Sequence, residues 1–389
     1  MAAFEQQEYQ DRISAVKTLM QQRGVDTLWV TCPPNMNYLT GYDAWSFYVH
    51  QGVIISLDLD APIWIGRHID ASAARLTSIV NSDDIVPYDE TYVTGDKHPM
   101  EFVADVFKKH RLDKGVLGVE MDTHYYTAQA HAVLVAALPN ASFEDADRLV
   151  NWVRIIKSPA ELKYQTQAGE ITDIAMQAAI DTIQVGTRQC DVAGVIFKNL
   201  ISGHPDYYGD MPDYQTLPMG ERTSAPLLTW TDELFTAGSA CTLELGANRY
   251  RYHAPLARTV VVGAVQDRLS NTAAYVNDGL HAALHAVKPG VRACDIEAAW
   301  RKSTEPHGIV KESRIGYSVG LGYPPDWGER TISLAPNDQN LLEENMVFHL
   351  MLGIWEEDCG YEISETFYVT KSGAECLSKM PRQLVVIDG

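Results

Sequence analysis

Three glutamates in the second half of the chain have the residue type and the setting for acid–base chemistry. Glu244 interrupts the apolar run TLELGA, while Glu362 and Glu365 lie three residues apart in EISETF. A carboxylate in an apolar run is costly to bury without a partner, and burial raises its pKa toward neutrality. These side chains could therefore exchange protons near neutral pH or accept hydrogen bonds from a cationic group. As the alternative, Glu365 faces solvent or forms a salt bridge with a neighbour.

Aromatic residues are the second group that could do chemistry. A planar amidinium ring carries positive charge and paired N–H donors, so a site for it needs carboxylates and aromatic faces. Arg258, His50 or His253 could pair with a carboxylate on such a substrate. Arginine in a strand more often anchors a sheet, and Asp326 could simply cap the PPDWGER turn. The aromatic candidates, some of which could equally be core residues, are Trp45, Tyr48, Trp230, Tyr252, Tyr317, Tyr323, Trp327 and Trp355.

Composition excludes several other classes of function. The chain has 389 residues with 31 Lys and Arg against 51 Asp and Glu, which gives a net charge of −20. Such a surface repels nucleic acid and anionic membranes, so we expect neither as a partner. The six cysteines form no CxxC pair and are expected to be free thiols. The N-terminus lacks the apolar core of a signal peptide, so we expect a cytoplasmic protein. Phosphate-binding, zinc-protease and nucleophile-elbow motifs are missing from the sequence.

The elements that must position these residues fall into two domains, 1–155 and 156–389. Ser158, followed by Pro159 and Glu161, marks the N-cap of a long helix just after the boundary. In the first domain, helical and strand-like patterns alternate, which predicts an α/β fold. The second predicts an α+β domain with a curved antiparallel sheet covered by helices on one face. Its expected strands are CTLELGA, ARTVVVGA, MVFHLMLGIW and ETFYVT, and its later helices are 271–287 and 293–307.

Several ordered motifs resemble the pita-bread family of creatinase, prolidase and methionine aminopeptidase. They are RIIKSPAEL, ARTVVVG, VKPG, MVFHLMLG and ETFYVT in the second half, and NYLTGYDAWSFY in the first. The resemblance implies a creatinase-type N-terminal α/β domain followed by a pita-bread catalytic domain. It also implies a homodimer in which GYDAWSFYVH of one subunit closes the site of the other.

Metallopeptidases of this family hold two divalent ions with two Asp, one His and two Glu. At those positions this chain has Glu244, Pro255, Tyr317, Met351 and Ser364. Divalent ions of this kind prefer carboxylate and imidazole ligands. The resemblance therefore implies an enzyme without metal or other cofactor. Because Glu365 adjoins the last of these positions, we predict Glu244 and Glu365 as the catalytic residues.

A narrower resemblance points to a metal-free branch of the fold, the ectoine hydrolases, which open a cyclic amidine. It is carried by GYSVGLGYPPDWGERTISL, GYDAWSFYVHQGV, IGRHID and RYRYHAPLARTV. One departure is Leu227, which stands where the fold usually carries a histidine that creatinase uses for proton transfer. An alkyl group cannot relay a proton, so either His253 or His349 substitutes, or the substrate or mechanism differs.

The resulting hypothesis is a metal-independent hydrolase that acts on a small zwitterionic or cationic cyclic amidine, with ectoine as the leading substrate. Glu244 accepts the ring N–H while Glu365 acts as general base or nucleophile. A deacetylase would be the expected pathway partner if the product is an N-acetylated diamino acid. Three alternatives stay open: a creatinase-like amidinohydrolase, a binding protein without activity, and a metal-dependent Xaa-Pro dipeptidase.

Overall fold

The computed structural model describes residues 3–146 and 148–389. The chain divides into two compact units, Met1–Arg154 and Ile155–Gly389, each with its own sheet. Within the described residues no helix is long and apolar enough to span a lipid bilayer.

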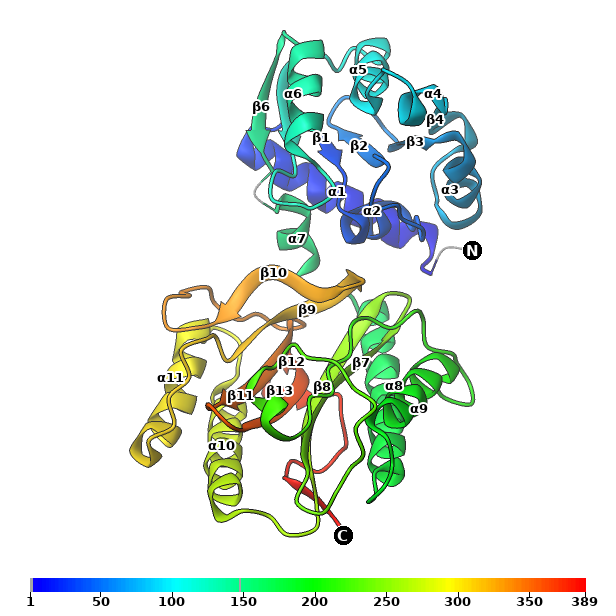
Figure 1. Cartoon of the computed structure of the whole chain (residues 1–389). Helices are drawn as coiled ribbons and strands as arrows, with labels where there is room; N and C mark the ends of the chain where they lie inside the picture. The colour runs from blue at the N-terminus through cyan, green and yellow to red at the C-terminus, as the bar shows by residue number, and fades with distance from the viewer. Residues whose placement is uncertain (1–2, 147) are drawn as a thin grey trace. The chain divides into compact units, whose positions relative to one another are not determined.

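The first unit is an α/β domain built on a six-stranded mixed sheet in the order β4-β3-β2-β1-β5-β6 (Figure 1). Alternate residues of β1 enter different cores: Leu28 packs toward α1, α2, α3 and α7, whereas Trp29 packs toward α5 and α6. Helices therefore cover both faces of this sheet, as an α/β layer requires. Its elements are α1 (Gln6–Arg23), β1 (Thr27–Val30), α2 (Pro33–Thr40), β2 (Gly52–Ser56), β3 (Ile63–Arg67), α3 (Ala71–Thr77), β4 (Ile85–Tyr88), α4 (Thr91–Thr94), α5 (Pro99–Lys109), β5 (Gly115–Val119), α6 (Ala128–Ala137), β6 (Ala141–Asp145) and α7 (Leu149–Arg154).

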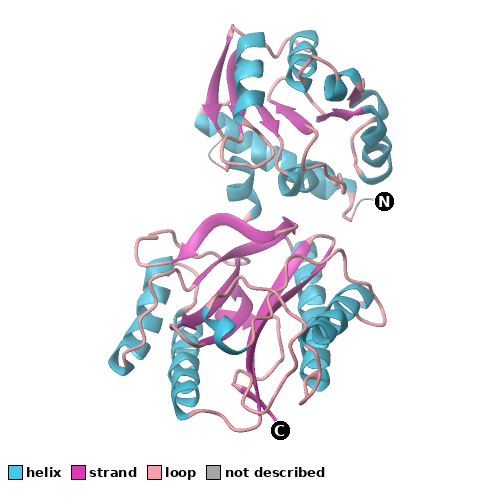
Figure 2. Ribbon diagram, in the orientation of Figure 1, coloured by secondary structure: helices cyan, strands magenta, loops and turns pink. Residues whose placement is uncertain are grey.

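The second unit has an eight-stranded, largely antiparallel sheet, whose main path runs β13-β12-β11-β9-β8-β14. Figure 2 shows its strands in magenta beside the cyan helices of the same unit. Strand β7 pairs with β8 and β10 pairs with β9. Among the described strands of this second sheet, only the short β14 lies parallel to its neighbour. The expected α+β architecture is confirmed. Its elements are α8 (Pro159–Thr182), α9 (Gln189–Ser202), β7 (Ala240–Arg249), β8 (Tyr252–Val262), α10 (Asp267–Ala286), α11 (Ala293–Thr304), β9 (Gly316–Tyr323), β10 (Asp326–Leu334), β11 (Val347–Trp355), β12 (Gly360–Thr370), β13 (Gly373–Cys376) and β14 (Val385–Ile387).

Helix α8 begins where its capping residues predict. Ser158 Oγ accepts from the Glu161 N–H at 3.2 Å, and the Glu161 carboxylate accepts from the Ser158 N–H at 2.8 Å. This reciprocal capping box satisfies two backbone donors that a helix N-terminus leaves open. The sequence patterns did not indicate α9 or the hairpin β9–β10, although the hairpin contains the GYPPDWGER segment.

The sheet of the second unit curls so that β8 and β12 lie side by side, although β9 and β11 stand between them in the strand order. Thr259 Oγ1 donates to the Glu362 carbonyl at 2.9 Å and accepts from its N–H at 2.8 Å. Side chains of β7 and β8 that point outward pack on α8 and α9 in one apolar core, for example Leu243 and Leu256. We call the opposite, concave side of the sheet the inner face.

Candidate active site

Two of the predicted carboxylates share the inner face. Glu244 in β7 lies between Leu243 and Leu245, which point into the helix-covered core, so its own side chain points inward. Glu362 in β12 is fully buried, and its Oε1 accepts a hydrogen bond from Trp355 Nε1 at 2.8 Å. Gly353 lies opposite Glu362 in the sheet, where a Cβ atom would come within 2.2 Å of the Trp355 ring. Glycine is needed there because the indole folds back over that position.

Lys311 completes this group, and no sequence motif singled it out. Its Nζ donates to the Gly353 carbonyl at 2.9 Å and lies 4.3 Å from the centre of the Trp355 ring. The residue belongs to the loop between α11 and β9, far from Glu244 and Glu362 in sequence. The sequence pattern around a single lysine in a polar loop predicts a surface residue, so only the tertiary structure could identify Lys311 as part of the site.

Burial sets the protonation of this group. It raises the pKa of Glu244 to about 7, with the Lys311 charge opposing the rise. Burial and the neighbouring Glu244 raise the pKa of Glu362 to about 8, and burial lowers the pKa of Lys311 to about 8. Among the described residues Glu362 Oε2 has no hydrogen-bond partner. Near neutral pH the pair can therefore offer one carboxylate as a base and one carboxylic acid as a proton donor.

The shifted pKa values of Glu244, Glu362 and Lys311 should make the free energy of unfolding depend on pH. The raised pKa of each glutamate contributes stability at low pH that is lost as pH rises through about 7 and about 8. The lowered pKa of Lys311 contributes stability at high pH that is lost as pH falls through about 8. The contribution of the group is therefore smallest near that pH.

Urea unfolding of the wild type and of a Glu244→Gln/Glu362→Gln variant, from about pH 5 to about pH 8, measures this effect. The wild type should lose stability relative to the variant as pH rises. A difference between the two proteins that does not change with pH would contradict the protonation states given above.

A second group on the inner face joins Tyr317, Trp327, His349 and Ser364. Trp327 Nε1 donates to Tyr317 Oη at 2.8 Å, and the same oxygen lies 3.0 Å from His349 Nδ1. His349 Nε2 lies 2.7 Å from Ser364 Oγ, which also accepts from the Ala257 N–H at 2.6 Å. Burial and the charge of Arg314 lower the pKa of His349 to about 3, so its ring is neutral.

The residues at the metal-ligand positions of the fold do not fit a pair of divalent ions. Of the five, only Glu244 offers a carboxylate. Tyr317 and Ser364 are instead engaged by N–H donors, from Trp327 and Ala257, and by His349. Pro255 and Met351 supply no oxygen or nitrogen side-chain ligand. Across residues 3–146 and 148–389, no group of three or more His, Cys, Asp or Glu side chains could hold a metal ion.

The structure does not support the prediction for Glu365. Its side chain lies on the outer side of β12, opposite to Glu362, because residues three apart in a strand point to opposite faces. There Glu365 Oε1 accepts from Arg258 Nη2 at 2.7 Å and lies 3.3 Å from Arg382 Nε. Both Glu365 and Arg258 are fully buried. Arg258 was predicted to contact the substrate. Its guanidinium instead connects β8 to β12 and to the segment at Pro381 by hydrogen bonds, which is a structural role.

His253 is engaged by the protein rather than left free for substrate. Its Nε2 lies 2.8 Å from Asp213 Oδ2, and its Nδ1 lies 3.4 Å from the Gly320 carbonyl. Both ring nitrogens face acceptors, so neither is available to take a proton from a reactant. Leu227, at the position where the fold usually has histidine, is 71% exposed.

Other predicted residues of the second unit also have structural partners. The hydroxyl of Tyr252 donates to Glu161 at 2.7 Å, and the Trp230 ring packs edge-on against Phe197. Tyr323 is buried, with the Arg251 guanidinium over its ring. Asp326 accepts from the Gly328 N–H at 2.8 Å, which matches the alternative that it caps the turn. These contacts argue against a direct role in binding substrate.

The predicted residues of the first unit lie in and after the loop that follows α2. Tyr48 is 65% exposed, and its hydroxyl accepts from Arg67 at 3.2 Å. The His50 ring lies 5.1 Å from that of His98, and burial lowers its pKa, with His98 adding to the effect. That Trp45, Tyr48 and His50 help to close the site of a partner subunit stays a prediction, as does the homodimer.

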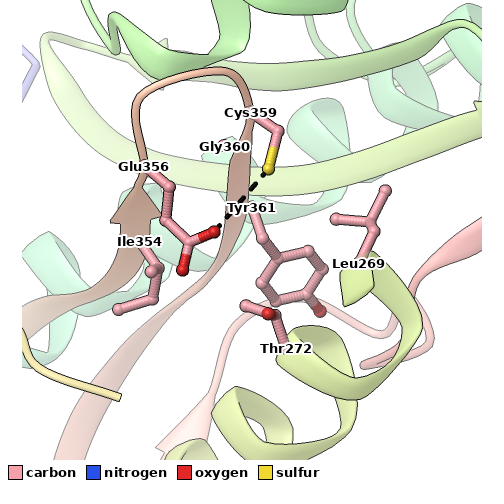
Figure 3. Close-up of a pocket in the computed structure, with 7 residues that line it drawn as sticks. All are labelled: Leu269, Thr272, Ile354, Glu356, Cys359, Gly360 and Tyr361. Atoms are coloured by element: carbon pink, nitrogen blue, oxygen red, sulfur yellow. Dashed lines mark hydrogen bonds between the residues drawn. The ribbon is translucent and has the colours of Figure 1, made fainter. Parts of the chain in front are cut away.

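A pocket lies on the other side of β12 from Glu362. Figure 3 shows the Tyr361 ring directed toward helix α10, and Glu356 with Cys359 at the β11–β12 turn. The Tyr361 hydroxyl donates to Asn277 of α10 at 2.8 Å. This pocket is therefore separate from the inner face. Its lining residues are Leu269, Thr272, Ile354, Glu356, Cys359, Gly360 and Tyr361.

Comparison with known proteins identifies related sequences for both halves of the chain. Residues 12–156 match the creatinase/prolidase N-terminal domain, and residues 163–371 match metallopeptidase family M24. Uncharacterized hydrolase/peptidase y4tM of Sinorhizobium fredii is 45% identical, with 99% of each chain covered. Ectoine hydrolase of Halomonas elongata is 40% identical, with 98% of each chain covered.

Solved structures of the same fold are more distant in sequence. Dipeptidase PepE from Mycobacterium ulcerans superposes with a TM-score of 0.84 at 19% identity, with 99% of this chain and 100% of that chain covered. An Xaa-Pro dipeptidase from Bacillus anthracis gives 0.82 at 20% identity, with 97% and 100% covered. At these identities the likeness establishes the two-domain fold alone.

Proposed function

The chain belongs to the creatinase/prolidase and M24 metallopeptidase family, and from this premise we propose that it opens the ring of a small cyclic amidine, with ectoine as the first substrate to test. The hydrolases among its relatives support hydrolysis in general. The ectoine hydrolase of Halomonas elongata, 40% identical, supports the narrower substrate class. The observation that carries the proposal is the buried pair of Glu244 and Glu362, with pKa values of about 7 and about 8 beside the Trp355 ring.

The charges of the site suit a substrate that is itself a zwitterion. The carboxylates and the Trp355 ring can bind an amidinium ring by hydrogen bonds and by stacking. Lys311 Nζ has three N–H donors, of which one is used by the Gly353 carbonyl. The remaining donors can pair with the substrate carboxylate. Binding of this kind needs no metal ion.

The carboxyl pair can carry the whole reaction. Glu244, as the ionised member of the pair, takes a proton from water as the water oxygen bonds to the amidine carbon. Protonated Glu362 then gives its proton to one ring nitrogen, and the C–N bond breaks with its electron pair going to that nitrogen. The hydroxyl proton of the intermediate passes to Glu362 as the amide carbonyl forms. The proton held by Glu244 passes to the released amine, which restores both carboxyl groups.

We expect ectoine turnover to persist after the protein is dialysed against a strong chelator. The reaction as proposed uses two carboxyl groups, and the donor set on the inner face does not fit a pair of divalent ions. Mass spectrometry should detect the N-acetylated diamino acid at an unchanged rate, with metal content well below one ion per chain by elemental analysis.

An Xaa-Pro dipeptide and creatine assayed in parallel test the competing functions. Loss of ectoine turnover on chelation, with recovery on adding a divalent metal, would contradict the metal-independent mechanism. Cleavage of the dipeptide in place of ectoine would identify a peptidase instead. Binding of ectoine without conversion would indicate a binding protein.

A further inference from the structure

Tyr317, His349 and Ser364 form a hydrogen-bonded chain whose two ends are both fixed by N–H donors. Trp327 Nε1 donates to Tyr317 Oη at one end, and the Ala257 N–H donates to Ser364 Oγ at the other. Between them the neutral His349 ring lies 3.0 Å from the Tyr317 oxygen and 2.7 Å from the Ser364 oxygen. A neutral imidazole has one N–H donor and one acceptor nitrogen, so the chain has two possible arrangements.

The two arrangements differ in which hydroxyl keeps an unused hydrogen. If His349 Nε2–H donates to Ser364, then Tyr317 donates to Nδ1, and the hydrogen of Ser364 is left over. If Ser364 donates to Nε2, then Nδ1–H donates to Tyr317, and the hydrogen of Tyr317 is left over. In this second case the Tyr317 oxygen accepts two hydrogen bonds, from Trp327 and from His349.

Burial selects the second arrangement. Ser364 is fully buried, and among the described residues its Oγ has no acceptor within reach other than His349. A spare hydrogen there would be an unsatisfied buried donor, which is costly. Tyr317 is half-buried as a residue, and the charge of Glu244 acts on its phenol, so a spare hydrogen of Tyr317 has an acceptor group on its side of the chain that Ser364 lacks.

Tyr317 lies within reach of the charge of the proposed base. Burial raises the pKa of Tyr317 and the charge of Glu244 adds to the rise, so the phenol keeps its hydrogen. A water molecule between the Glu244 carboxylate and the Tyr317 hydroxyl would give its proton to the first and accept a hydrogen bond from the second. That hydrogen bond strengthens as the water oxygen becomes negative, so it stabilises the transition state more than the bound substrate.

We propose that Ser364 and His349 are positioning residues that leave the hydroxyl hydrogen of Tyr317 free for donation to the attacking water beside Glu244. Tyr317 is then a catalytic residue. Two members of this hydrogen-bonded chain, Tyr317 and Ser364, stand at positions where the metallopeptidases of this fold have metal ligands. The catalytic part of this inference rests on the proposed function, whereas the arrangement of hydrogens does not.

Nitrogen NMR of protein labelled in the histidine rings tests the arrangement without any substrate. A His349→Gln variant assigns the signal, and circular dichroism confirms that each variant is folded. We expect a neutral His349 ring with its proton on Nδ1. In Ser364→Ala the proton should stay on Nδ1, because a proton on Nε2 would be a buried donor without an acceptor, while the Nε2 signal should shift because that nitrogen no longer accepts a hydrogen bond. Ser364→Thr, which keeps the hydroxyl, should leave the Nε2 signal near its wild-type position. A wild-type ring protonated on Nε2 would overturn the inference, whatever the substrate.

Kinetics with ectoine test the catalytic part. Tyr317→Phe should lower kcat by about 10²–10³-fold with KM changed only a few-fold, because the lost hydrogen bond acts mainly in the transition state. Ser364→Ala should lower kcat by about tenfold, with Ser364→Thr close to the wild type. Equal losses in kcat for the Ala and Thr variants would indicate a merely structural role. Absence of turnover in the wild type would reject the proposed function and leave the NMR result to stand by itself.

Discussion

Replacing Glu244 by glutamine should lower kcat for ectoine by about 10²–10⁴-fold, which is the range that a positioned general base contributes. Glutamine keeps the shape of the side chain but cannot take a proton from water. The variant should be folded, and near pH 8 it should be at least as stable as the wild type, because burial disfavours ionised Glu244, whose pKa is raised to about 7. Steady-state kinetics combined with urea unfolding measures both effects.

Glu365→Gln is the matched control, because it makes the same chemical change on the opposite face of the sheet. Glu365 is bound by Arg258 at 2.7 Å and is fully buried. We expect this variant to lose stability while kcat changes only a few-fold. A folded Glu365→Gln protein with kcat reduced as much as in Glu244→Gln would restore Glu365 as a catalytic residue and contradict the assignment of Glu362.

Replacing Arg258 by methionine should destabilise the protein by about 3–5 kcal/mol, the usual result of removing one partner from a buried ion pair. The guanidinium donates to the carbonyls of Ala257, Ser364, Met380 and Pro381 and to the Glu365 carboxylate. Methionine keeps much of the volume but leaves these acceptors without their donor. Burial already raises the pKa of Glu365 against the opposing charge of Arg258, so loss of that charge should favour the protonated form further.

Urea unfolding of Arg258→Met, Glu365→Gln and the double variant gives the coupling between the two residues. The double variant should recover part of the stability lost in Arg258→Met, because no charge is then buried without a partner. A loss below about 1 kcal/mol in Arg258→Met would show that the pair is not structural.

The sequence by itself was sufficient to predict the family, the α/β and α+β character of the two halves, and the main strands of the second half. Apolar and β-branched runs such as those around Glu244 and His349 carry that information locally. The capping residues Ser158 and Glu161 likewise located the start of α8 correctly. The family resemblance also implied that Pro255 and Met351 stand where the metallopeptidases have metal ligands.

Only the tertiary structure decided which of these side chains face the inner side of the sheet. Spacing shows that Glu362 and Glu365 point to opposite faces of β12, but not which face lies against α10. That choice depends on packing between segments far apart in sequence, as when Arg258 of β8 holds Glu365 on the outer side. Lys311 reaches the site from a loop for the same reason: a site on a curled sheet is assembled by long-range contacts, which local sequence patterns do not encode.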